Sequence, residues 1–146
     1  LLNAPSAVVP GKKYDLMIEL LDPGQSRWGF ELTALDEAAN NAGQILVTDP
    51  ARTQLTHDTL LNRDYLKHTT VGTNAATPGP TQWAFQWVAP QTFNSITFYF
   101  TGNAADNSDF FFGDYIYSRS VTLLQTAPVD PGTWGQIKGL FRGAGR

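Results

Sequence analysis

Apolar residues recur at every second position in several short stretches of this chain. Tyr14–Leu21, Trp28–Leu35 and Gln82–Val88 all alternate in this way, and the last places three aromatic rings on one face. A period of two is typical of a β-strand with one buried face, whereas an amphipathic helix repeats every 3.6 residues. Alternation, β-branched residues and aromatic content predict further strands at Gln44–Thr48, Ser95–Thr101, Asp109–Tyr117 and Arg119–Leu124.

Turn-forming residues separate these stretches. Asp22–Pro23–Gly24 and Asp49–Pro50 are strong turn signals, and Gly72–Pro80 is a loop rich in Gly, Pro, Thr and Asn. Thr53–Leu61 is compatible with a short strand and a loop, and Asn62–Lys67 with one helical turn. About eight short strands with no long helix between them predict an all-β fold, an immunoglobulin-like antiparallel β-sandwich.

The character of the chain changes after residue 125, which divides it into three parts. We expect the sandwich to occupy residues 1–125, a Pro-rich linker residues 126–132, and a short amphipathic helix residues 133–146. This tail has apolar residues at near-helical spacing. It could pack on its own sandwich, contact a neighbouring subunit, or lie on an anionic surface through its basic residues; we favour packing against protein. The apolar residues of the tail are Trp134, Ile137, Leu140 and Phe141.

Composition excludes several classes of function. The chain has 146 residues, a formal net charge of −3 and no cysteine. Without cysteine there are no disulfides, thiolate metal sites, iron–sulfur clusters or covalently attached haem. The basic residues are scattered, so we expect no nucleic-acid binding. No apolar run approaches the ~20 residues of a membrane span. Because it begins at Leu1, we expect a processed or trimmed product.

The loop between the last aromatic runs concentrates the side chains most typical of a binding site. Asp106, Asn107, Asp109 and Asp114 could offer several of the six to eight oxygen ligands that calcium prefers. The spacing does not match an EF-hand. An ordinary solvated turn explains the same residues, since Asn and Asp bond to their own backbone. Asp114 could instead cap a strand or pair with Arg27 or Arg119. Calcium is therefore a possible cofactor, and no other is expected.

A second candidate function, sugar binding, depends on whether the aromatic rings are buried or exposed. Alternation favours the core for most of them, because one face of each strand must fill the sandwich. Rings exposed on the other face would instead form a platform for sugars. The rings concerned are Trp28, Trp83, Trp87, Tyr99, Tyr115 and Tyr117.

Catalytic machinery is not recognisable in the sequence. His57 and His68 are the only histidines, and there is no nucleophile motif of the G-x-S-x-G type. We expect His68 to make a structural hydrogen bond that ties the 65–73 loop to the sheet. The sequence predicts that the protein is not an enzyme.

Four blocks of sequence resemble a known family. These are Val9–Tyr14 (VPGKKY), Gln25–Leu35 (QSRWGFELTAL), Tyr65–Thr73 with Trp83–Pro90 (YLKHTTVGT, WAFQWVAP), and Ile96–Tyr117. They resemble the bacterial reelin-like domain often called choice-of-anchor V, which is related to the reeler domain of animal extracellular matrix proteins. The resemblance spans Ala4–Leu124 and implies an exported surface or adhesion module without assigned activity. Many bacterial members carry a haem-binding Cys-x-x-Cys-His segment just before the sandwich. This chain has no cysteine, so a redox role cannot be carried over to it. A third possibility, an accessory domain of a redox protein, depends on the sequence upstream of Leu1.

These observations suggest an extracellular or cell-surface protein, exported from a bacterium, that serves adhesion or self-assembly. A specific version is a filament subunit joined through its two apolar ends. In that version a neighbour's sheet gains the N-terminal strand by strand addition, so deleting residues 1–9 should abolish polymers and leave a soluble domain. The rival hypothesis is a module that binds carbohydrate or another small ligand, possibly with calcium. The predicted assembly residues are Leu1, Leu2, Val8, Val9 and the four apolar residues of the tail.

Overall fold

The computed structural model describes residues 1–108, 110 and 112–126. These residues form eight β-strands and one short 3-10 helix, so the predicted all-β fold is confirmed. The strands are β1 (Lys13–Leu20), β2 (Arg27–Leu35), β3 (Gln44–Val47), β4 (Thr53–Asp58), β5 (Arg63–His68), β6 (Thr81–Val88), β7 (Ser95–Ala105) and β8 (Tyr115–Leu124), and the helix is η1 (Val71–Thr73). The predicted linker and C-terminal helix, residues 127–146, lie outside the described residues.

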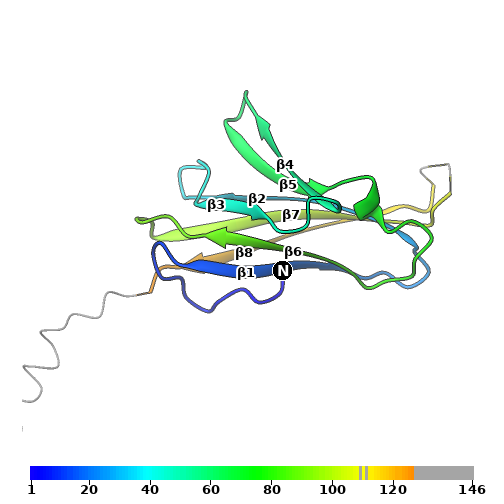
Figure 1. The fold of residues 1–146 in the computed structure, drawn as a ribbon, viewed down its shortest axis with the longest axis horizontal. Coiled ribbons are helices and arrows are strands. Elements are labelled where there is room, and N and C mark those ends of the chain that lie inside the picture. The colour runs from blue at the N-terminus through cyan, green and yellow to red at the C-terminus, as the bar shows by residue number, and fades with distance from the viewer. Residues whose placement is uncertain (109, 111, 127–146) are drawn as a thin grey trace, which may run out of the picture.

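Two antiparallel sheets make up the sandwich (Figure 1). One has the strand order β1-β6-β3 and the other the order β4-β5-β2-β7-β8. Aromatic pairs join the two layers. Trp87 of β6 meets Phe98 of β7 edge-on, with ring centroids 5.1 Å apart, and Phe30 of β2 lies 4.6 Å from Trp83 of β6. The core is therefore built from the alternating positions that the sequence pattern singles out.

The indole N–H groups of the three buried tryptophans all make hydrogen bonds. Each indole N–H donates to a backbone carbonyl: Trp28 to Thr77 at 2.8 Å, Trp83 to Gly72 at 2.9 Å, and Trp87 to Ala42 at 2.9 Å. All three acceptors lie outside the strands, so the rings fix the long connections to the core as well as filling it. The prediction that Trp28, Trp83 and Trp87 belong to the core is confirmed.

The region predicted as a helical turn is a strand. β4 and β5 form a hairpin whose register runs from Thr53↔His68 to Asp58↔Arg63, and Leu66 of β5 is fully buried. A helical turn of six residues has little stability of its own, whereas the hairpin gains cross-strand hydrogen bonds along its whole length. β5 pairs with β2 at only two positions, and the hairpin then diverges from the body of the sandwich (Figure 1).

The final hairpin also differs from its prediction. β7 continues to Ala105, and β8 is one unbroken strand in place of two. Ser118, at the predicted break, bonds side chain to side chain with Thr101 at 3.0 Å, so the ladder continues through it. The expectation that Tyr99, Tyr115 and Tyr117 are core residues is wrong, since about half of each side chain is exposed. Tyr99 lies on the outer face. Tyr117 pairs with Gly102, which lies against Leu20 at the end of β1, and Tyr115 is two residues nearer the β7–β8 loop.

Candidate functional site

The acidic loop between β7 and β8 forms an ordinary side-chain turn. One oxygen of Asp106 accepts a hydrogen bond of 2.8 Å from the backbone N–H of Ser108. This bond holds the pKa of Asp106 below its usual value. Asp109 lies outside the described residues, and the part of the chain that is described contains no cluster of three acidic or histidine side chains suited to a metal. Calcium binding at Asp106, Asn107, Asp109 and Asp114 stays a prediction.

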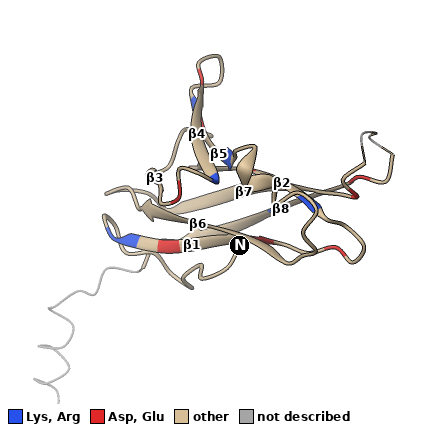
Figure 2. Cartoon of the chain, turned by 45° about the vertical axis from the view of Figure 1, so that its right-hand side comes forward, with Lys and Arg blue, Asp and Glu red and all other residues tan. Residues whose placement is uncertain are grey.

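Asp114 makes neither of the ion pairs considered for it. Among the described residues the one ion pair joins His57 to Asp64, at 2.8 Å. Asp114 is therefore not within ion-pair distance of Arg27 or Arg119. Charged residues of both signs are spread over the strands and loops (Figure 2).

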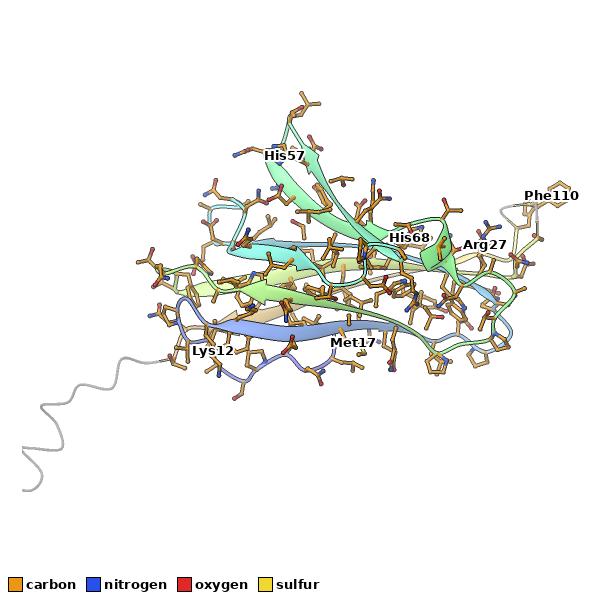
Figure 3. All side chains as sticks on the ribbon, viewed as in Figure 1. Lys12, Met17, Arg27, His57, His68 and Phe110 are labelled. Atoms are coloured by element: carbon orange, nitrogen blue, oxygen red, sulfur yellow. The ribbon has the colours of Figure 1, made fainter. Side chains whose placement is uncertain are left out.

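Several exposed large apolar residues lie at the same end of the molecule, on the β7–β8 loop and at the start of β8. We call this set the apolar tip and define it as Phe110, Phe112, Tyr115 and Ile116, which are between 53% and 72% exposed. Figure 3 shows Phe110 projecting at the far end of the β7–β8 loop. Exposed clusters of large apolar residues commonly mark interaction sites. The sequence analysis predicted a strand at Asp109–Tyr117, weighed Tyr115 as a core ring, and did not identify an exposed apolar surface here.

Behind the tip, a groove of about 400 Å³ runs between the edges of the two sheets. Leu20, Phe100 and the N-terminal leucines line its floor, and Glu19, Asp22 and Arg119 its rim. Tyr117 closes one end by donating a hydrogen bond of 2.7 Å to Asp22, which raises the pKa of the tyrosine.

The N-terminal segment packs on its own sandwich. Val8 is completely buried, its N–H donates to Leu124 at 2.8 Å, and its carbonyl accepts from Thr126 at 2.8 Å. Leu2 forms an antiparallel bridge with Met17 of β1. The segment thus links the edge strands of both sheets. Of the predicted assembly residues, Leu1 packs against the core, Leu2 and Val9 are exposed, and Trp134, Ile137, Leu140 and Phe141 lie outside the described residues.

His68 has the structural role expected of it. Its Nδ1 lies 3.0 Å from the backbone N–H of Phe30, beyond the last backbone pair of β2 and β5. The His68 ring thereby takes the place of a backbone hydrogen bond between β2 and β5 at the point where the hairpin diverges. Gly29 makes room for it, because a Cβ at that position would lie 2.8 Å from His68 Cε1.

Replacing Gly29 with alanine should therefore destabilise the protein by about 1–3 kcal/mol, the usual range for overpacking. The free energy of unfolding in urea measures this. Gly29→Ala in a His68→Ala background is the control: without the ring, the cost of the added methyl should fall close to zero. An equal cost in both backgrounds would show that the imidazole is not the neighbour that matters.

A second hollow lies on the outer face of the five-stranded sheet, where the β4–β5 hairpin diverges. It measures about 400 Å³ and adjoins a smaller one of about 120 Å³. Thr33 and Tyr99 line both, and Arg63 of β5 lines the larger one. The sequence analysis considered Tyr99 but not Thr33 or Arg63, because only the hairpin's divergence brings β5 over this face.

Glu37 borders the same hollow and is fixed by Ser95. Both the backbone N–H and the hydroxyl of Ser95 donate to one Glu37 oxygen, at 2.6 and 2.9 Å. These bonds lower the pKa of Glu37. The carboxylate is thus a charged acceptor at neutral pH.

Comparison with known proteins identifies the fold. No protein-family model and no curated protein sequence matches the chain. Among solved structures, the reeler domain of human F-spondin superposes with a TM-score of 0.56 and 20% sequence identity, over 84% of this chain and 82% of that one. The chain therefore has a reeler-like β-sandwich fold. None of the helices among the described residues is long and apolar enough to cross a membrane.

Proposed function

We propose that this chain is an extracellular, non-enzymatic surface protein of the bacterial choice-of-anchor V type, whose sandwich serves adhesion or self-assembly as a filament subunit. The reeler-like fold supports the family assignment made from the sequence blocks. The pairing β2-β7-β8 matches the C-F-G sheet of immunoglobulin domains, and β1-β6-β3 has the arrangement of their B, E and D strands.

The observation that best supports assembly is the position of the apolar tip. β8 has ten residues, so it extends about 30 Å from Tyr115 at the tip to Leu124 at the opposite end. The last described residue, Thr126, lies at that opposite end, because it is two residues after Leu124 and its backbone N–H donates to the Val8 carbonyl. The apolar sequence from Trp134 to Phe141 follows it along the chain. Contact between the tip of one subunit and the tail of the next is head-to-tail, and such a contact extends into an open fibre unless its rotation closes a ring.

The N-terminal segment, residues 1–9, contributes to assembly only if two subunits exchange this segment. Val8 occupies the core of its own subunit, so strand addition to a neighbour would have to repeat the same contacts in the second subunit, as in domain swapping. The apolar tip is already exposed and needs no such release. Tip-to-tail contact is therefore the main joint in this proposal.

A tip variant tests this joint directly. Phe110→Ser combined with Ile116→Lys should reduce the association constant at least about thirtyfold, the loss of one strong interface residue, and leave the fold intact because both side chains are exposed. Sedimentation and negative-stain electron microscopy measure the polymer. The matched control is Leu60→Ser with Leu61→Ser, two exposed leucines on the β4–β5 turn, which should polymerise normally.

Deleting residues 127–146 should have the same effect as the tip variant. If the tip variant polymerises as well as the unmodified protein while the tail deletion does not, the tail binds elsewhere. Polymerisation by both altered proteins would refute the tip-to-tail joint.

A further inference from the structure

The larger hollow on the outer sheet face has the construction of a ligand site. Strand β2 contributes its floor, β7 one side and the diverging β5 the other, and the loop after β2 closes one end. The loop is fixed in place, because Asn41 accepts a hydrogen bond of 2.8 Å from the backbone N–H of Asp64 in β5. Its volume of about 400 Å³ is within the range of ligand pockets.

Two residues that line this hollow each have a buried polar atom without a hydrogen-bond partner among the described residues. The atoms are the hydroxyl oxygen of Thr33, a residue that is 6% exposed, and Nε of Arg63. A buried polar group without a partner costs free energy, and such groups in folded proteins call for an explanation. Because both residues line the same hollow, one molecule bound there could pair with both atoms once the two side chains turn toward it.

Tyrosine rings supply a flat surface beside these atoms. Tyr99 is directly opposite Thr33 in the β2–β7 ladder, so the two side chains share one face, and the phenol is half exposed. Tyr65 of β5 lines the smaller adjoining hollow. A half-exposed ring with hydroxyl, guanidinium and carboxylate groups around it suits a molecule that has both an apolar face and hydroxyls.

The charged residues around the hollow indicate which class of ligand it can bind. Arg63 has no carboxylate within ion-pair distance in the described part of the chain, whereas Asp36 and Glu37 also border the hollow. A polyanion would be repelled by these two carboxylates, and the single arginine does not outweigh them. A neutral polyhydroxylated ligand can donate to Glu37 and accept from Arg63 at once.

We propose that this hollow binds a neutral saccharide, with one sugar ring stacked on Tyr99 and its hydroxyls bonded to Thr33, Arg63 and Glu37. The two adjoining hollows, both lined by Thr33 and Tyr99, fit a short run of linked sugars. The site is independent of the filament, because it lies on the outer sheet face and contains none of the tip residues.

Isothermal titration calorimetry with short oligosaccharides tests the site without contributions from avidity. The probes are neutral glucan, mannan and galactan fragments, with uronic-acid oligosaccharides as the charged comparison. At least one neutral series should bind saturably, with an affinity insensitive to salt between 50 and 500 mM, as expected where no charge pairs are screened. Tyr99→Ala should weaken that binding about thirtyfold. Leu60→Ala, which removes an exposed apolar side chain on the β4–β5 turn outside both hollows, should leave it unchanged.

Thr33→Val separates a ligand role from a structural one. Valine has nearly the same shape but no hydroxyl, so the variant should keep or raise the melting temperature while binding weakens about fivefold, the effect of one hydrogen bond. Saturable binding to no neutral series, tighter binding to the uronic acids, or unchanged affinity in both Tyr99→Ala and Thr33→Val would each overturn the proposal.

Discussion

Trp87→Ala is expected to remove a large fraction of the free energy that stabilises the fold. The side chain is completely buried, and its ring contacts Phe98 across the sandwich and Tyr14 beside it. Truncating a buried tryptophan costs about 3–5 kcal/mol. The variant also deprives the Ala42 carbonyl of its indole donor, which adds about 1–3 kcal/mol if the carbonyl stays buried. Together these costs are about 4–8 kcal/mol, a large fraction of the roughly 5–15 kcal/mol that stabilises a typical domain.

Urea or thermal unfolding followed by near-ultraviolet circular dichroism measures the effect of Trp87→Ala. Trp87→Phe is the graded control, because it keeps an aromatic ring against Phe98 and loses only the indole hydrogen bond and part of the volume. It should lie between the alanine variant and the unmodified protein. A Trp87→Ala protein that unfolds at the same urea concentration as the unmodified one would mean that the two sheets do not meet at this ring.

Val8→Asp should be nearly as damaging, although it lies in a segment without regular strand structure. Val8 has no exposed surface and joins the hydrophobic core, while its backbone bonds to Leu124 and Thr126. An aspartate there is a buried charge without a partner, and substitutions of this kind cost about 4 kcal/mol or more. By the same argument, deleting residues 1–9 should destabilise the domain itself, and the soluble domain expected after that deletion stays a prediction.

Val9→Asp is the matched control for Val8→Asp. Val9 is the next residue along the chain and 43% of its side chain is exposed. Its cost should stay within about 0.5 kcal/mol, the usual range for surface positions. The difference in urea midpoint between the two aspartate variants therefore measures how firmly the N-terminal segment is held. Equal midpoints would mean that Val8 is not part of the core in solution.

The sandwich was predictable because alternation reports directly on burial. β6 is the clearest case: its residues alternate between buried and more exposed as the sequence pattern requires. The β4–β5 hairpin was not predictable in the same way, since its polar residues show no period of two. Its pairing depends on the partner strand, which single-sequence periodicity does not contain.

The candidate sites were less predictable than the fold, for a geometric reason. Tyr115 and Tyr117 have the alternation of core residues, but they lie where β1 ends, so each is only about half covered. The outer hollow is lined by Arg63 and Thr33, which are 30 positions apart in sequence. They border one hollow because β5 diverges from β2. The sequence suggested exposed rings as the sign of a sugar site, and Tyr99 is such a ring.

The central claim, head-to-tail assembly through the apolar tip, is tested most directly by cryo-electron microscopy of the native material. The proposal predicts unbranched fibres in which each subunit's long axis follows the fibre and Phe110, Tyr115 and Ile116 are buried against the next subunit. Native material that consists of single 16.0 kDa domains, or fibres in which these three side chains still face solvent, would contradict it.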